Sequence, residues 1–390
     1  MRPTMASWVI PLLLAGVIAV SIAETYDCTI EKDNDLEICV FRNVKYFKNT
    51  TQIAFYSPGS TKPENVAFKD SHMVAIPPNF LIAFADNLKV LKVENCQLQT
   101  VTITKNLLAL HAKNNYIEKV LMYRNNQCEN LRELDLSSNR LGNVANVTSC
   151  LKLETLNLSE NEDLWEDSTL DLSVFSNMVQ LQDLNLAGTG VLYLDNTKKI
   201  GLPLLKTIDL SKNDILPSDL RLEIFYPFTA LETLKLNDNN MDSIDYAHLL
   251  DMKSLKAVYL NGNSFQCRNI KDMLDFLQEH NIATPTDRHS NCEQNEREVE
   301  GMCCTGPMPP RPRPEPVPSP QTTPSPPPPQ PPPEEPGKTD HEDGHKAQDN
   351  TNGSNEGGNG SSHLVIIGAA VIVIVAAIGG GIYWYKRRSA

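Results

Sequence analysis

The sequence predicts an α/β leucine-rich-repeat solenoid with disulfide-bonded N- and C-terminal caps, followed by a disordered proline-rich stalk and one transmembrane helix. Three observations predict this fold class. The spacing L-x-x-L-x-L-x-x-N-x-L recurs between Val66 and Phe265, cysteines flank that region, and an apolar run lies near each end of the chain. The spacing is that of a leucine-rich repeat, in which no unit buries its own core and stability comes from stacking.

The asparagine position of the repeat can be followed along residues 63–266. It is occupied in turn by Ser71, Cys96, Asn115, Asn139, Asn161, Thr189, Asn213, Asn239 and Asn263. We therefore expect eight repeats and one degenerate first repeat, with two inward leucines per short strand, each worth ~1.5–3 kcal/mol when buried. The asparagine carboxamide can bond backbone groups of its own and the next turn. Thr189 can replace it and Cys96 does so weakly, so Cys96 is expected to be a buried free thiol, with a disulfide as the alternative.

The two ends of the chain predict a type I single-pass protein of the plasma membrane with an extracellular ectodomain. Residues 1–23 read as a signal peptide, and 24–62 as an N-terminal cap. Residues 364–385 are apolar and end in aromatic residues, and the tail 386–390 is basic, which fits a transmembrane helix with a cytoplasmic tail that is too short for a signalling domain. A removed lipid-anchor signal is the alternative, disfavoured by the basic residues that follow the apolar run.

Residues 305–363 are rich in proline and then in glycine and asparagine, so we expect an extended stalk. The net charge of -13 argues against nucleic acid as a partner. The histidines form no metal-binding pattern, since the close pair His341 and His345 lies in the stalk, and we expect neither a metal nor another cofactor.

Nine cysteines in a secreted chain predict a disulfide framework with one cysteine left over. Cys28 and Cys39 bracket a turn and are expected to close a hairpin over the first repeat. Cys128 and Cys150 each precede the first leucine of a repeat by three residues, so stacking would bring them about one strand spacing apart, ~4.8 Å. We expect a disulfide there, with two free thiols as the alternative.

Residues 267–304 are expected to form the C-terminal cap. An amphipathic helix is predicted from Arg268 to His280, with an apolar face of Ile270, Met273, Leu274 and Leu277 that closes the end of the core. Cys267 is expected to pair with Cys292 or with one of the adjacent pair Cys303 and Cys304. Two interpretations of that adjacent pair remain: both cysteines bond within the cap, or one links the protein to a second chain as a disulfide-linked dimer.

The N-terminal cysteine pair, the short irregular repeats, the run Asn263 to Cys267 and the Cys303-Cys304 doublet together resemble the mosquito leucine-rich-repeat immune protein family over residues 24 to about 304. The resemblance implies a role in innate immunity and a protein partner, either a complement-like thioester protein or another leucine-rich-repeat protein. Soluble members carry a coiled coil after the doublet. Here a proline-rich stalk and a predicted membrane helix follow, which resembles the family's transmembrane subclass.

The sequence contains no catalytic constellation, so we expect a binding protein and not an enzyme. The candidate partner-binding surface is the concave face, formed by the residues between the two leucines of each strand. These residues are Lys92, His111, Asp135, Asn157, Asn185, Asp209, Lys235 and Tyr259. Each of them is also what a solvated strand face needs without any partner.

Glycosylation sequons begin at Asn49, Asn146 and Asn157, and further ones lie in the stalk. A glycan on Asn157 would stand on the candidate surface and displace binding to its flanks. Two function classes follow: a cell-surface receptor or co-receptor of innate immunity, and an adhesion or developmental receptor subunit.

Overall fold

The computed structural model describes residues 24–307, apart from residues 34, 48–52, 126–127, 287–291 and 293–294. The predicted signal peptide, most of the stalk, the predicted transmembrane helix at 364–385 and the sequon at Asn49 lie outside the described residues. Among the described residues, no helix is long and apolar enough to cross a membrane.

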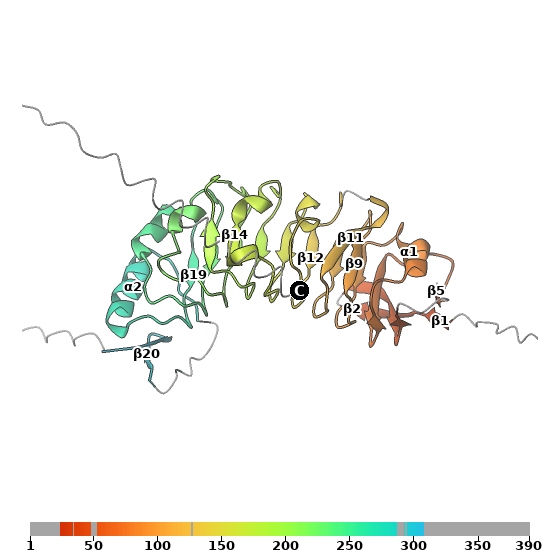
Figure 1. Ribbon diagram of the computed structural model, residues 1–390, viewed down its shortest axis with the longest axis horizontal. Coiled ribbons are helices and arrows are strands. Elements are labelled where there is room, and N and C mark those ends of the chain that lie inside the picture. The colour runs from red at the N-terminus through yellow and green to blue at the C-terminus, as the bar shows by residue number, and fades with distance from the viewer. Residues whose placement is uncertain are drawn as a thin grey trace, which may run out of the picture. The chain divides into compact units, whose positions relative to one another are not determined.

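The main sheet contains eleven strands in the described part of the chain, and their coils stack along a curved array (Figure 1). In sheet order from the C-terminal end, the strands are β19 (Ala257–Tyr259), β18 (Thr233–Lys235), β17 (Thr207–Asp209), β15 (Asp183–Asn185), β13 (Thr155–Asn157), β12 (Glu133–Asp135), β10 (Ala109–His111), β8 (Val90–Lys92), β6 (Asn65–Lys69), β3 (Leu36–Arg42) and β2 (Thr29–Asp33). All neighbours pair in parallel except β2 and β3, which form an antiparallel hairpin. This is the predicted solenoid.

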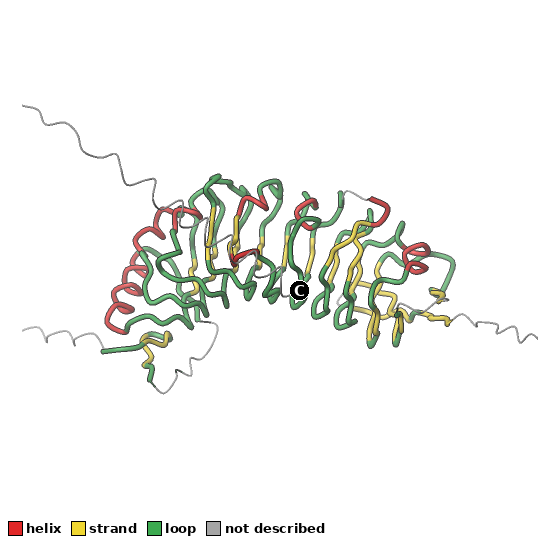
Figure 2. The backbone as a smooth tube through the Cα atoms, in the orientation of Figure 1, coloured by secondary structure: helices red, strands yellow, loops and turns green. Residues whose placement is uncertain are grey.

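Separate two-stranded sheets lie outside the main sheet. They are β1 (Glu24–Asp27) with β5 (Ile53–Tyr56), β4 (Lys45–Tyr46) with β7 (His72–Met73), β9 (Thr100–Ile103) with β11 (Lys119–Met122), β14 (Thr169–Asp171) with β16 (Tyr193–Asp195), and β20 (Arg297–Val299) with β21 (Met302–Cys304). The coils also contain short 3-10 helices: η1 (Tyr123–Asn125), η2 (Val147–Ser149), η3 (Glu166–Ser168), η4 (Leu172–Phe175), η5 (Leu222–Phe225) and η6 (Tyr246–Asp251). Figure 2 shows that loop makes up most of each coil between these short elements.

The inward leucine positions form the core that the sequence predicts. The first inward position of each repeat strand is at most 1% exposed, and its occupants are Val66, Leu91, Leu110, Leu134, Leu156, Leu184, Ile208, Leu234 and Val258. One hydrophobic cluster runs without a break from Cys28 to Cys304. Each coil therefore buries its leucines against its neighbours, as a stacked array requires.

Buried asparagines join successive coils. The Oδ1 atom of Asn139 accepts a hydrogen bond from Ile117 N (2.9 Å), and its Nδ2 donates to Ala112 O (3.0 Å) and Leu136 O (2.9 Å). The same pattern recurs at Asn115, Asn161, Asn213, Asn239 and Asn263. The expectation that these side chains bond their own and the next turn is wrong in direction, because the second set of bonds runs to the preceding coil.

Two of the three substituted ladder positions, Thr189 and Cys96, differ in what they provide. Thr189 Oγ1 donates to Leu186 O in its own coil (2.9 Å) and accepts from Trp165 Nε1 of the preceding coil (3.1 Å). Cys96 is fully buried and is not part of a disulfide, as expected, and its Sγ lies 3.2 Å from Glu94 O. Burial raises the pKa of the Cys96 thiol to about 12, so the group stays protonated and inert at neutral pH.

The turn that leaves each of the nine repeat strands in the main sheet, from β6 to β19, has a left-handed residue immediately before the ladder position. All nine of these residues have φ between 53° and 71°, although only Gly188 and Gly262 among them are glycines. The other seven are Asp70, Asn95, Asn114, Ser138, Glu160, Lys212 and Asp238. Because an L side chain resists this conformation, the stacked coil imposes it on these seven residues.

Disulfides close both caps and link two coils. The structure joins Cys28 to Cys39 across the β2–β3 hairpin and Cys128 to Cys150 between successive coils, with Cα–Cα separations of 5.4 Å and 4.9 Å. In the C-terminal cap, Cys267 bonds Cys304 and Cys292 bonds Cys303. Both members of the doublet are therefore bonded within the chain, and the alternative of an interchain bridge through Cys303 or Cys304 is not what the structure contains.

Two helices lie at the ends of the array. Helix α2 (Cys267–Glu279) buries Ile270, Met273, Leu274 and Leu277, the face that the sequence predicts. Helix α1 (Pro78–Phe84) was not predicted. Its Pro78 occupies the first turn, where a missing N–H costs little, and its buried face adds Phe80 and Phe84 to the N-terminal core.

Candidate partner-binding surface

The predicted binding residues form a single column on the exposed side of the main sheet, which we call the main-sheet face. Strand pairing places Lys92 opposite His111, His111 opposite Asp135, and Asp135 opposite Asn157. The pairing continues in the same register through Asn185, Asp209, Lys235 and Tyr259. The column is partly exposed throughout except at Asp209, which is buried.

At its N-terminal end the column is occupied by contacts within the chain. Lys92 Nζ lies 2.6 Å from Asp33 Oδ2 in the β2 strand of the cap. The hydrogen bond from Lys92 holds the pKa of the Asp33 carboxyl below its ordinary value, which is the sign of a formed pair. His111 Nδ1 lies 3.8 Å from Glu133 Oε1. Lys92 is thus already engaged with the hairpin and is not a free group for a partner.

In the middle of the column the side chains also build the turns. The Oδ1 atoms of Asp135, Asn157, Asn185 and Asp209 each accept a hydrogen bond from the backbone N–H two residues later, at 2.9 to 3.1 Å. Asp and Asn favour such turns because their short side chains reach their own backbone. The repeat spacing alone predicts a solvated or partner-binding role for these positions and does not indicate this structural one.

At its C-terminal end the column links three strands. Lys235 Nζ lies 3.2 Å from Asp209 Oδ2 and 5.4 Å from the centre of the Tyr259 ring. Asp209 Oδ1 also accepts from Ser211 Oγ at 2.6 Å. This chain of contacts fixes Asp209, Lys235 and Tyr259 relative to one another, so the surface here is held in place before any partner arrives.

Two adjoining hollows lie over this half of the face. One, of about 230 Å³, is lined by residues of β13, β15, β17 and β18 and includes Thr155, Asn157 and Asp183. The other, of about 240 Å³, lies over the turns that follow β13 to β19. Its residues include Glu160, Lys212, Asn237, Asp238 and Asn261, none of which the sequence analysis selected. Their fixed position two or three residues after each column residue is the signal that could have found them.

The sequons that lie in the described residues occupy different surroundings. Asn157 is half-buried in β13, and its Oδ1 accepts from Ser159 N (3.1 Å) and Oγ (2.8 Å), so the sequon hydroxyl is itself engaged. Asn146 is exposed at the start of η2, away from the main-sheet face, and its Nδ2 donates to Val120 O (2.7 Å). A glycan at Asn146 would leave the main-sheet face open, whereas one at Asn157 would stand upon it.

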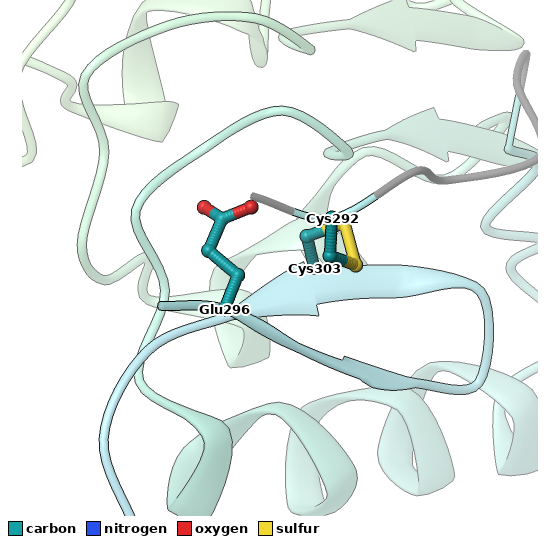
Figure 3. A group of neighbouring side chains, drawn as sticks. All are labelled: Cys292, Glu296 and Cys303. Carbon is teal, nitrogen blue, oxygen red and sulfur yellow. A yellow bond between two sulfur atoms is a disulfide. The ribbon is translucent and has the colours of Figure 1, made fainter. Parts of the chain in front are cut away.

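Three potential metal-binding residues gather in the C-terminal cap. The donor atoms of Cys292, Glu296 and Cys303 lie within 4.8 Å of one another, and Figure 3 shows the three side chains. The two sulfur atoms are joined in a disulfide. Because a cysteine binds metal as a thiolate, only the Glu296 carboxylate could act as a ligand, and this cluster does not fit a metal ion.

Comparison with known proteins gives matches to repeat proteins. Residues 203–265 match the family model described as leucine rich repeat. The chain is 28% identical to Tsukushi of Gallus gallus over 172 residues, which cover 42% of this chain and 43% of that protein. It is 27% identical to trophoblast glycoprotein of Macaca fascicularis over 203 residues, covering 47% of this chain and 48% of that protein. The chain thus spans less than half the length of these curated relatives.

Similar solved structures include the LRIM1/APL1C complex, with 18% identity, a TM-score of 0.39, and coverage of 72% of this chain and 71% of that chain. The leucine-rich repeat domain of APL1B has 20% identity and a TM-score of 0.46, and the match covers 69% of this chain and 85% of that chain. The family match shows leucine-rich repeats at residues 203–265, and the repeat spacing and the stacked parallel strands extend the same solenoid fold through the described repeat region.

Proposed function

We propose that the chain is a cell-surface receptor or co-receptor of innate immunity that recognises a protein partner through the C-terminal half of the main-sheet face. The observation that carries the binding role is the surface from Asn157 to Tyr259, where polar side chains are fixed in register beside two adjoining hollows. A rigid face costs less conformational entropy on association than a mobile one.

The location of the protein is supported by the sequence and by the disulfides. Four disulfides favour an oxidising compartment, and the predicted signal peptide and membrane helix favour the cell surface. Staining of intact cells with an antibody against the repeat domain tests this part. Signal only after permeabilisation would contradict it.

The immune role is supported by the cysteine arrangement, which resembles that of the mosquito leucine-rich-repeat immune family. The resemblance implies that the partner is a complement-like thioester protein or another leucine-rich-repeat protein. Blood cells should raise expression of the protein on infection, and the full chain on their surface should capture a protein from body fluid in both the presence and the absence of reductant. Aggregation of cells that carry the protein, without added fluid, would instead favour the adhesion alternative.

A matched pair of variants tests which face binds. Tyr259 lies on the main-sheet face, whereas Tyr193 is 46% exposed in β16, outside the main sheet. Tyr259→Ala should weaken capture of the partner by about tenfold or more, because an aromatic side chain is the commonest kind of residue to dominate a binding interface. Tyr193→Ala should leave capture unchanged. If only Tyr193→Ala lost capture of the partner, the binding surface would lie on the other side of the coils.

A further inference from the structure

The hollow over the turns after β13 to β19 contains hydrogen-bond acceptors that the chain leaves unused. Asn237 is 7% exposed, and its Oδ1 atom has no hydrogen-bond partner among the described residues. The Oδ1 atom of Asn261, at the equivalent position one coil later, is buried and likewise has no partner in the described part of the chain. Both residues line the same hollow. A buried acceptor without a partner costs free energy, so this hollow favours a ligand that brings donors.

The charges around the hollow are paired except at one carboxylate. Lys212 Nζ lies 2.9 Å from Glu160 Oε1, and Lys235 Nζ lies 3.2 Å from Asp209 Oδ2. No lysine, arginine or histidine among the described residues forms an ion pair with Asp238, whose Oδ2 accepts from Asn237 Nδ2 at 2.9 Å. The two lysines are therefore balanced by two carboxylates, and Asp238 contributes the excess negative charge.

Gly262 provides the space for this carboxylate. Its φ is +71°, and a Cβ built on it would lie 2.1 Å from Asp238 Oδ1. The Asp238 carboxylate thus lies directly over the turn that follows Asn261. A side chain at residue 262 would force the carboxylate away, so the absence of one leaves Asp238 its place at this turn, on the wall of the hollow.

We propose that this hollow receives the guanidinium group of an arginine presented by the protein partner. The proposal rests on the proposed function and names the chemical group that the main-sheet face selects. A guanidinium carries five N–H donors and no acceptor, so it can satisfy Asn237, Asn261 and Asp238 together. The hollow holds about 240 Å³, which is large for a single metal ion and suits a side chain.

The test uses the purified full chain and three small probes in place of the unknown partner. The probes are the N-acetyl methylamides of arginine, lysine and citrulline, and binding is measured by ligand-observed nuclear magnetic resonance. The arginine probe should bind at least tenfold more tightly than the other two, because lysine lacks the planar fork and citrulline lacks the charge. Equal binding of the three probes would overturn the proposal.

Variants locate the binding site. Asp238→Asn and Asn261→Ala should each weaken binding of the arginine probe about tenfold, and both substitutions leave the ladder asparagines intact. Glu133→Gln, a matched control on β12 outside the hollow, should leave binding unchanged. Unchanged binding in Asp238→Asn would show that no guanidinium site of this kind exists.

The two proposals fail separately. When Tyr259→Ala abolishes partner capture but the arginine probe does not bind, the main-sheet face binds the partner and the guanidinium inference is wrong. When the probe binds at Asp238 but Tyr259→Ala leaves capture unchanged, the hollow recognises arginine and the assignment of the partner surface is wrong.

Discussion

The N-terminal coils and the later coils hold the same stack together by different means. From Asn115 onward, an asparagine ladder interrupted only at Thr189 bonds each coil to the preceding one. At the N-terminal end Ser71 and Cys96 occupy the ladder positions, and within the described residues Ser71 Oγ makes two bonds, with Val44 N and Lys69 O. An aromatic cluster lies there instead, formed by Phe41, Phe55, Phe68, Phe80 and Phe84 with neighbouring ring centres 5.0 to 6.0 Å apart.

The difference shows that the ladder and the aromatic cluster are two solutions to one problem. A coil must satisfy its buried turn and must also adhere to its neighbour. Asparagine does both with up to five hydrogen bonds, as at Asn213. Where serine and cysteine leave fewer bonds, large rings bury more apolar area, and the Cys28–Cys39 disulfide fixes the hairpin at the end.

The largest expected effect is at the centre of the aromatic cluster. Phe80 contacts four other rings, whereas the equally buried Phe225 pairs, in the described part of the chain, with one ring, that of Phe228 at 6.5 Å. Phe80→Ala should lower the free energy of unfolding by roughly 3–5 kcal/mol, at the upper end of such substitutions. Phe225→Ala should cost less. Urea unfolding of the two variants measures both, and a larger loss at Phe225 would remove the special role of the N-terminal cluster.

The next largest effect is the loss of stability when a ladder residue is replaced, and two ladder positions are compared. Asn213→Ala leaves the buried N–H groups of Thr189 and Val191 without their acceptor and removes one of the donors to three backbone carbonyls, so it should cost roughly 2–4 kcal/mol. Ser71→Ala removes two bonds and should cost about 1 kcal/mol. The same unfolding assay compares them. Equal losses would mean that the ladder contributes no more in the later coils than serine does at the N-terminal end.

A smaller effect concerns the left-handed turn residue, which both regions share. Gly262→Ala places a Cβ at φ +71° and against Asp238, and should destabilise the protein by roughly 1–2 kcal/mol. The reverse change, Ser138→Gly, relieves strain but frees the unfolded chain, so its effect should stay within about 0.5 kcal/mol. A neutral Gly262→Ala in thermal unfolding would show that the turn can rearrange.

The smallest effect is a dependence on pH that separates the two ends. The pKa of His248 is raised above its ordinary value of 6.5, first by its hydrogen bond to Asp251 (3.2 Å) and then by the charge of Asp245. A raised pKa in the folded state gives stability that is fully present below pH 6.5 and is lost as pH rises through the folded pKa. Thermal unfolding from pH 6 to 9 should show this loss in the native protein and not in His248→Gln.

The N-terminal ion pairs provide the control for that prediction. Hydrogen bonds from Lys69 and Arg42 lower the pKa of Glu31 below its ordinary value of 4.5, so its contribution is present above pH 4.5 and is lost as pH falls through the folded pKa. Glu31→Gln should therefore alter thermal stability without changing how that stability varies with pH above pH 6. If Glu31→Gln changed the dependence of stability on pH above pH 6, the pH dependence would arise at the N-terminal end and not at His248.

The candidate surface could be predicted only in part from the sequence. The column from Lys92 to Tyr259 follows from the repeat period, because equivalent residues of stacked coils must share a register. That Lys92 is already held by Asp33, and that Asn185 supports its own turn, could not be read from the period. Helix α1 was missed because its short apolar stretch lacks a repeat signal.

The sequence by itself determined the stacking of the coils, the inward leucines, the ladder positions and the buried face of α2, because each depends on a local period that repeats along the chain. Only the tertiary structure decided the pairing of Cys267 with Cys304, the left-handed turn residues and the hollow at Asn237. Cys267 and Cys304, and the residues that line the hollow, are far apart in the chain, and stacking fixes their separation in space, which no local pattern encodes.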